Sequence, residues 1–168
     1  MNEAVEMINP TVAPEDSAAQ AAAAMLMSAF QKQRQSYLAD PIPDLQQRKD
    51  DLLALKRMLS ENRDEILEAI SLDYGNRSRH ESLFAEVIAV TDGINDTIKQ
   101  LKKWMKPQKL HVDISLYPGA KIRVSPQPLG VVGLIVTWNF PINLAFSQLT
   151  GAFASGNRAM VKMSENSI

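Results

Sequence analysis

A pattern of strand, turn, helix and strand over residues 128–165 constrains this fold most. Val131 to Val136 is a short apolar run before turn-forming residues, and such a run is typical of a strand buried on both faces of a parallel sheet. Pro141 suits the first turn of a helix, and apolar residues at helical spacing continue to Gly156. Arg158 to Met163 alternates as a second strand does. Because a helix joins the strands, we expect a parallel β-α-β unit with a right-handed crossover.

The residues before this unit predict several helices. Residues 17–38 are rich in Ala, Met and Gln, and the prolines at 41 and 43 end that helix. Three pairs of polar residues then have the spacing of a capping box, which marks a helix start. The pairs are Asp44 and Gln47, Asn62 and Glu65, and Ser78 and Glu81. Gly75 suits the left-handed position after the third helix.

Apolar residues recur along one face of two of these helices. In the helix that follows Asp44 they are Leu45, Leu52, Leu55 and Leu59. In the long helix that follows Ser78 they are Phe84, Val87, Ile88, Thr91, Ile94, Ile98, Leu101 and Met105. We expect these faces to form the core between the helices.

Residues 111–125 alternate between apolar and polar side chains and contain a turn. His111 to Tyr117 and Lys121 to Ser125 flank a Pro-Gly pair, which predicts an antiparallel hairpin. We therefore expect an α/β chain with four segments. These are a disordered tail (1–16), a helical segment (17–106), a hairpin (107–127) and the start of a nucleotide-binding domain (128–168).

Composition disfavours several classes of function. The chain has 168 residues, 45% of them apolar, and a net charge of −1, so a sizeable core is expected and a nucleic-acid partner is not. Lysines near residue 103 fit the end of a helix dipole. Residues 1–16 lack the Lys and Arg of a leader peptide, and no apolar stretch is long enough to span a bilayer. We expect a cytoplasmic protein with no membrane partner and no metal site.

Three groups of residues carry a resemblance to a known family. They are Gln127-Pro128-Leu129-Gly130-Val131-Val132, Thr137-Trp138-Asn139-Phe140-Pro141, and Gly156-Asn157 with Lys162-Met163-Ser164-Glu165. In this order and at these separations they resemble the N-terminal third of the aldehyde dehydrogenase superfamily. Thr137 is similar to the class 3 branch, and Asp73 to Ser78 resembles bacterial coniferyl aldehyde dehydrogenases. Met163 departs from the Pro that the family usually has there.

The resemblance implies a Rossmann-like NAD-binding domain and a role for Asn139. Its side-chain amide would donate to the oxygen that becomes negative when a cysteine thiolate attacks an aldehyde. The position agrees with this role, because it follows the carboxyl end of a strand, where open α/β sheets bind ligands. The alternative is that Asn139 caps the helix that begins near Pro141.

The resemblance also implies a set of cofactor contacts. Lys162 and Glu165 would reach the hydroxyl groups of the adenosine ribose, and Glu165 favours NAD over NADP because a carboxylate repels a 2′-phosphate. NADP stays open as the alternative, because the charge of Lys162 could offset that repulsion. The remaining contacts would come from Ile135, Val136, Thr137 and Trp138. The alternatives are a solvated charged turn for Lys162 and Glu165, and ordinary core packing for the others.

The absence of cysteine limits what this chain is expected to do alone. The implied reaction is the oxidation of an aldehyde, with coniferyl aldehyde as one candidate, and it needs a thiolate that the 168 residues do not contain. We therefore expect this chain to be inactive by itself. Two alternatives stay open, which are one half of a split enzyme and a helical interaction module that binds intact homologues. Through the same resemblance, the hairpin implies a dimer or tetramer for the full-length enzyme, and the alternative is a hairpin that only covers the helices.

Overall fold

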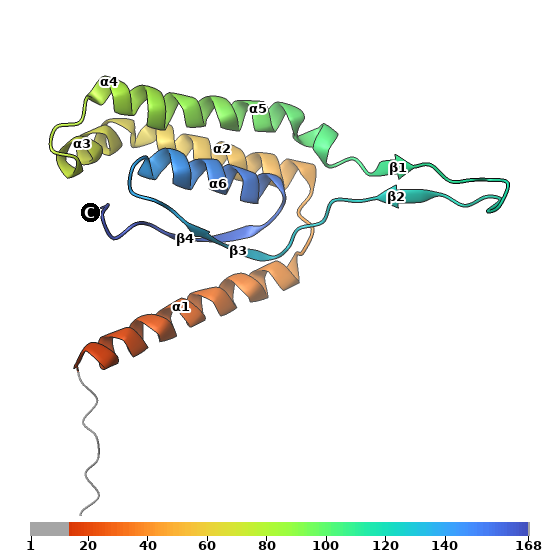
Figure 1. The fold of residues 1–168 in the computed structure, drawn as a ribbon, viewed down its shortest axis with the longest axis horizontal. Helices are drawn as coiled ribbons and strands as arrows, with labels where there is room; N and C mark the ends of the chain where they lie inside the picture. The colour runs from red at the N-terminus through yellow and green to blue at the C-terminus, as the bar shows by residue number, and fades with distance from the viewer. Residues whose placement is uncertain (1–13, 168) are drawn as a thin grey trace, which may run out of the picture.

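The computed structural model describes residues 14–167, with side chains from residue 17 onward. Its elements, in chain order, are α1 (Pro14–Ala39), α2 (Leu45–Glu61), α3 (Arg63–Asp73), α4 (Arg79–Ser82), the π-helical η1 (Leu83–Ile88), α5 (Ala89–Trp104), β1 (Gln108–Leu110), β2 (Ile122–Val124), β3 (Val131–Ile135), α6 (Pro141–Ala154) and β4 (Arg158–Lys162) (Figure 1). The predicted tail lies outside the described residues except for 14–16, which begin α1.

Strands β3 and β4 form a parallel pair joined by α6, which confirms the predicted β-α-β unit. The register runs from Val131 opposite Arg158 to Ile135 opposite Lys162. Helix α6 packs on one side of this pair with α2 and α5 beyond it, while α1 passes along the other side (Figure 1). The arrangement is a small layered α/β fold in which the helices carry most of the core.

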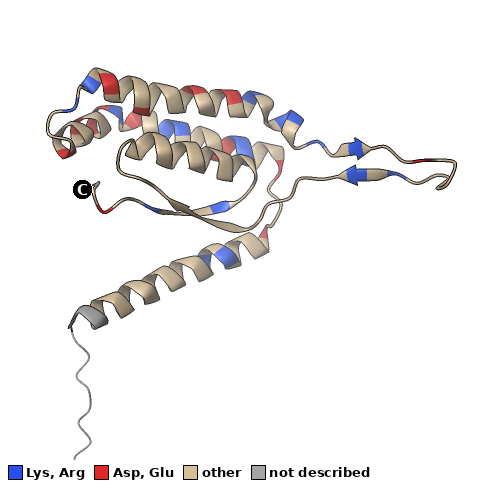
Figure 2. Cartoon of the chain, in the orientation of Figure 1, with Lys and Arg blue, Asp and Glu red and all other residues tan. Residues whose placement is uncertain are grey.

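The core lies between α2, α5 and α6. Leu52, Leu59, Ile94 and Leu101 are each at most 1% exposed. Helix α6 carries no charged residue, whereas charges mark α2, α3 and α5 (Figure 2). The uncharged helix is therefore the central one, as expected for an element with neighbours on several sides.

Strand β3 is less buried than its sequence predicts. Ile135 is 76% exposed, and Gly133 is also exposed. The described sheet has two strands, and α1 passes only part of its other face (Figure 1). The prediction of a strand buried on both faces is therefore wrong for this structure, although its length and direction are confirmed.

The predicted capping boxes are only partly present. Asp44 caps α2, because its carboxylate accepts a hydrogen bond of 2.9 Å from the backbone N–H of Gln47. The side chain of Asn62 instead donates to the Met58 carbonyl at the end of α2, so it does not cap α3. Ser78 precedes α4 but makes no side-chain capping bond. The helix starts are confirmed, while the last two caps are wrong.

Replacing Asp44 by alanine is expected to lower the free energy of unfolding by about 1 kcal/mol, the usual cost of a lost N-cap. Gln47→Ala is the matched control, since the Gln47 side chain bonds to Asp51 and not back to the cap residue. Urea unfolding followed by circular dichroism measures both variants. An equal decrease in the free energy of unfolding in both variants would contradict a cap formed by Asp44 alone.

The long helix changes its winding near its start, and this rotates its buried face. Phe84 is 71% exposed and Ile88 is 41% exposed, so the prediction that these two residues lie on the buried face is wrong. A π-helical turn holds more residues than an α-helical turn, so the residues of η1 depart from the α-helical spacing. Val87 and Glu86 point inward instead, and from Ile94 onward the predicted face is confirmed.

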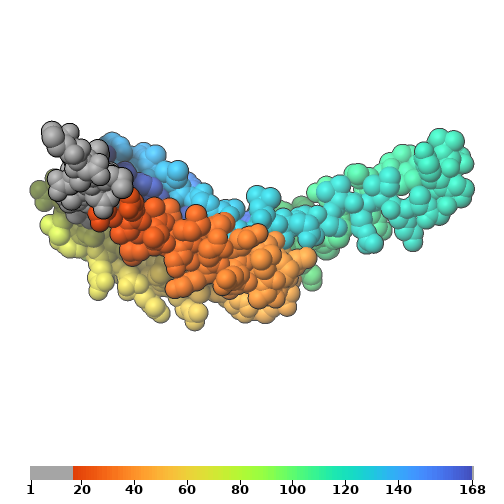
Figure 3. Space-filling view, turned by 90° about the horizontal axis from the view of Figure 1, so that it is seen from below, coloured from red at the N-terminus to blue at the C-terminus, as the bar shows by residue number. Residues whose placement is uncertain are grey.

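Strands β1 and β2 form a hairpin that extends away from the body as an arm (Figure 3). Gln108 pairs with Val124 and Leu110 with Ile122, so the first strand lies nearer to α5 than predicted. The predicted strand at 111–117 is wrong. The Asp113 carboxylate accepts bonds from the backbone and hydroxyl of Ser115, and such a local turn competes with strand pairing.

Helix α1 keeps an apolar surface exposed. Met25, Leu26 and Met27 are 74%, 63% and 57% exposed. Across residues 14–167 the structure contains no helix with the length and apolar character needed to cross a membrane.

Candidate functional site

The turn that follows β3 lies at the carboxyl edge of the parallel strands. Val136, which is 2% exposed, directly follows β3 and donates its N–H to the Lys162 carbonyl at 2.9 Å. The next residues, Thr137, Trp138 and Asn139, are exposed at this edge. Open α/β sheets bind their ligands at this edge, so the turn is placed where a small molecule can reach it.

Asn139 presents its side chain outside the helix that follows. The Thr137 hydroxyl donates to the Asn139 side-chain oxygen at 2.8 Å, so the amide NH₂ group points away from Thr137. The cap residue of α6 is Phe140, which has no side-chain capping bond. The alternative role of Asn139 as a helix cap is therefore wrong, and its amide N–H groups do not serve the first turn of α6.

Glu86 supplies the missing cap from a different helix. Its carboxylate accepts hydrogen bonds of 2.9 Å and 3.0 Å from the backbone N–H groups of Ile142 and Asn143. The residue is 0% exposed, and burial raises the pKa of this carboxyl, while both N–H donors and Arg77 act in the opposite direction. A carboxylate at a helix N-terminus is favourable because the first N–H groups have no partner inside the helix.

Arg77 connects Glu86 to the turn. Its guanidinium donates to the Asn139 carbonyl at 2.9 Å and lies 3.3 Å from the Glu86 carboxylate. It also stacks over the rings of Tyr74 and Phe140, at 5.1 Å and 4.5 Å from their centroids. The sequence offered Arg77 only as part of a resemblance, and Glu86 was not singled out at all. A charged residue among the inward-facing positions of a helix would have indicated Glu86. The π-helical turn changes which residues face inward, so the regular helical spacing did not place Glu86 there.

Tyr74 also packs against the turn. Its ring stacks on Trp138 with the centroids 5.9 Å apart and an interplanar angle of 23°. Trp138 remains 51% exposed, so the stack with Tyr74 covers only part of this residue. The core-packing alternative therefore fits Val136, which is buried, better than Ile135 or Trp138.

Lys162 and Glu165 lie at the end of the neighbouring strand. The Lys162 ammonium donates to the Glu165 carboxylate, and both side chains are more than half exposed, at 59% and 81%. The hydrogen bond from Lys162 lowers the pKa of the Glu165 carboxyl. The pair is thus a charged, solvent-facing feature at the same sheet edge as Asn139.

Replacing Lys162 by methionine is expected to raise the pKa of Glu165 toward its ordinary value, because the main cause of the lowered pKa is removed. The depressed pKa also means that the pair stabilises the fold above the unfolded pKa and ceases to do so as the pH falls through the folded pKa. Carboxyl ¹³C NMR titration measures this pKa. Lys99→Met, which removes a different exposed pair with Asp96, is the control and leaves Glu165 unchanged.

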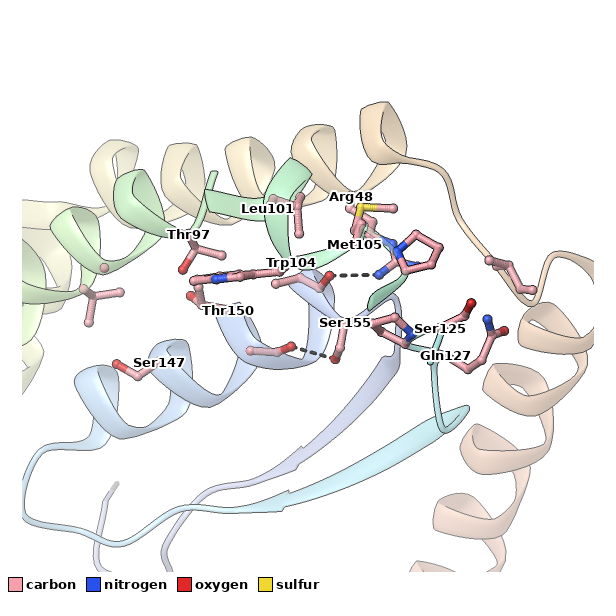
Figure 4. A pocket seen from close by; sticks show the side chains of 17 residues that line it. Arg48, Thr97, Leu101, Trp104, Met105, Ser125, Gln127, Ser147, Thr150 and Ser155 are labelled. Carbon is pink, nitrogen blue, oxygen red and sulfur yellow. Dashed lines mark hydrogen bonds between the residues drawn. The ribbon is translucent and has the colours of Figure 1, made fainter. Parts of the chain in front are cut away.

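A cavity in the described part of the chain lies away from this edge. A cavity of about 680 Å³ lies between α5, α6 and the residues before β3, with Trp104, Met105 and Thr150 on its wall (Figure 4). At one end the buried Arg48 donates to the Ala154 carbonyl at 3.0 Å. None of the predicted site residues lines this cavity. The candidate site is therefore an open edge formed by the turn and the charged pair, and not this cavity.

Comparison with known proteins gives one consistent result. A sequence profile described as "Aldehyde dehydrogenase family" matches residues 2–168. The chain is 46% identical over 141 residues to a "probable coniferyl aldehyde dehydrogenase" of Pseudomonas aeruginosa and covers 29% of it, with 84% of this chain aligned. It is 43% identical over 143 residues to a coniferyl aldehyde dehydrogenase of Pseudomonas sp. strain HR199, again covering 29% of the relative and 85% of this chain.

A solved structure extends the agreement to the fold. The structure described as the substrate-bound state of Staphylococcus aureus AldH superimposes with a TM-score of 0.78 at 28% identity. The match covers 83% of this chain and 30% of that one, so the chain spans less than a third of the relatives it matches. With the profile match across residues 2–168, the chain belongs to the aldehyde dehydrogenase family.

Proposed function

We propose that this chain contributes the oxyanion donor and part of the cofactor site of an enzyme that oxidises an aldehyde to a carboxylic acid with NAD or NADP. The observation that carries the proposal is the free position of Asn139. Its side-chain oxygen is held by Thr137, and Glu86 caps the helix in its place. An amide held in this way has N–H groups available for a ligand at the sheet edge.

An amide suits the charge that develops in this reaction. When a nucleophile adds to an aldehyde, the carbonyl oxygen becomes negative, and a donor held beforehand stabilises it without reorganisation. Asn139 is neutral, so it does not attract competing anions in the resting state. The 168 residues include no cysteine, and in our proposal the nucleophile comes from residues outside them.

Lys162 and Glu165 suit the ribose end of a nicotinamide cofactor. A carboxylate accepts hydrogen bonds from two hydroxyl groups, and both side chains face solvent beside the turn. The cofactor would accept a hydride from the adduct. We favour NAD over NADP, since Glu165 repels a 2′-phosphate and the charge of Lys162 is already paired with it.

The substrate we propose is an aromatic aldehyde such as coniferyl aldehyde. The support is the likeness to two relatives that carry this name, both above 40% identity. Trp138 is the residue of the turn that supports the choice physically, because it is 51% exposed and its ring can stack with an aromatic ring.

A chimeric enzyme tests this function. In it, these 168 residues replace the matching N-terminal part of the coniferyl aldehyde dehydrogenase of Pseudomonas sp. strain HR199, and we call this protein the chimera. We expect aldehyde-dependent formation of reduced nicotinamide, faster with NAD than with NADP. A chimera that unfolds cooperatively, like its parent, and yet shows no such activity would overturn the proposal.

The hairpin supports a homo-oligomer as the working form. Along this arm Ile114, Leu116 and Tyr117 are 71%, 71% and 64% exposed, and such apolar surface is typical of a protein interface. The same observation favours the second candidate function, a module that binds intact homologues. Sedimentation of the 168-residue chain mixed with the Pseudomonas relative tests the module, which requires a stable mixed complex, while the activity of the chimera tests the enzyme.

A further inference from the structure

We propose that Arg77, held by Glu86, is a positioning residue that sets the orientation of Asn139. This inference rests on the proposed function, because it concerns how the oxyanion donor is held. Its direct basis is the 2.9 Å hydrogen bond from the Arg77 guanidinium to the backbone carbonyl of Asn139. Arg77 comes from the loop after α3, which lies 62 residues before Asn139 in the sequence.

The backbone of this loop is shaped to bring Arg77 to the turn. Gly75 and Asn76 both have left-handed φ angles, 64° and 76°, and the Asn76 N–H donates to the Ser71 carbonyl at 2.7 Å. Two left-handed residues in succession reverse the chain sharply at the end of a helix. As a result Tyr74, before the reversal, and Arg77, after it, both contact the residues around Asn139.

The charge of Arg77 is balanced and shielded. Its side chain is only 9% exposed, and its guanidinium is paired with the buried Glu86 and with the more exposed Glu81 at 3.3 Å. The rings of Tyr74 and Phe140 lie against it. A buried guanidinium with a carboxylate, a carbonyl and two rings around it has few alternative positions, so it is a rigid support.

Glu86 connects Arg77 to the first turn of α6, which follows Asn139. It accepts from Arg77 with one oxygen and from the N–H groups of Ile142 and Asn143 with the other. The Asn143 side chain also donates to the Ala85 carbonyl. The peptide that carries Asn139 is therefore held before it by β3 and after it by η1, with Arg77 bonded to its carbonyl.

Loss of Arg77 is expected to affect the rate of reaction more than substrate binding. Without the guanidinium, the Asn139 carbonyl loses its partner, and the peptide and side chain can rotate together. A misplaced group can cost up to about 10²-fold in rate even when the change is away from the chemistry. An oxyanion donor acts mainly in the transition state, so the loss appears in kcat and not in KM.

Steady-state kinetics of the chimera test this. Arg77→Met is expected to lower kcat about 10- to 100-fold with little change in KM. Arg77→Lys retains a donor for the carbonyl and is expected to recover part of the loss. Glu81→Gln, which alters only the exposed partner of Arg77, is the matched control and keeps kcat. An unchanged kcat in Arg77→Met would overturn the inference.

A double mutant separates positioning from a general loss of stability. If Arg77 acts through Asn139, adding Arg77→Met to Asn139→Ala lowers kcat less than about twofold further, because the group it positions is already absent. If the decreases in kcat of the two single variants multiply in the double variant, Arg77 does not act through Asn139 and the inference is wrong. Thermal unfolding of each variant identifies any that fail to fold, and Arg77→Lys then provides the comparison.

Hydrogen exchange gives a readout that does not depend on activity. In Arg77→Met the backbone N–H groups of residues 137–140, 142 and 143 are expected to exchange faster than in the unmodified chimera, while in Asn139→Ala they do not. Unchanged exchange in Arg77→Met would overturn the support that we assign to Arg77. Faster exchange together with full activity of Asn139→Ala would instead overturn the proposed function, so the two failures can be told apart.

Discussion

Replacing Asn139 by alanine is expected to lower kcat of the chimera by about 10²- to 10³-fold, the usual effect of removing one oxyanion donor. The amide is exposed at the sheet edge, its oxygen is bonded to Thr137, and the neighbouring helix is capped by Glu86. The substitution therefore removes a donor without removing a cap. Initial rates at saturating aldehyde and NAD measure the effect.

Two further variants sharpen this prediction. Asn139→Asp keeps the size of the side chain but replaces the donor by a carboxylate, so it should lose at least as much activity as alanine. Asn62→Ala removes an exposed asparagine at the junction of α2 and α3, far along the chain from the turn, and should keep kcat. If Asn139→Ala loses less than about tenfold, Asn139 is not the main oxyanion donor.

Replacing Ile94 by alanine is expected to lower the free energy of unfolding by about 2–5 kcal/mol, the usual cost of truncating a fully buried isoleucine. Ile94 is 0% exposed and belongs to the core between α2, α5 and α6. The removed methyl groups leave a cavity that close-packed neighbours fill only in part. Urea unfolding followed by tryptophan fluorescence measures the change.

Leu72→Ala is the matched control for this substitution, because it truncates an aliphatic side chain of the same size at a position of α3 that is 71% exposed. An exposed substitution usually changes stability by less than about 0.5 kcal/mol. Similar decreases in the free energy of unfolding in both variants would mean that the helices do not form the main core.

The β-α-β unit could be predicted because its signals are local. An apolar run of strand length, Pro141 at a helix start and Gly156 at its end each depend on a few neighbouring residues. The position of Asn139 at the sheet edge follows from the same pattern. The structure confirms the strands and the helix, and it leaves the chemical role of Asn139 as a proposal.

The supports of the turn could not be predicted because they are not local. Arg77 and Glu86 reach Asn139 and Ile142 from segments more than fifty residues away. In addition, the π-helical turn at Leu83–Ile88 changes which residues face inward, so a regular helical spacing placed Phe84 in the core and gave no sign of Glu86. Non-local contacts and irregular windings both lie outside what a spacing pattern contains.

The exposed face of α1 provides natural probes for chemical footprinting. Met25 and Met27 are both more than half exposed, and peroxide converts an accessible methionine to its sulfoxide. Mass spectrometry can follow this addition of oxygen at each residue separately. Any chain segment or subunit that packs against α1 would slow the oxidation of both methionines. Their sulfoxide yields therefore report how much of this helix is covered in the assembled protein.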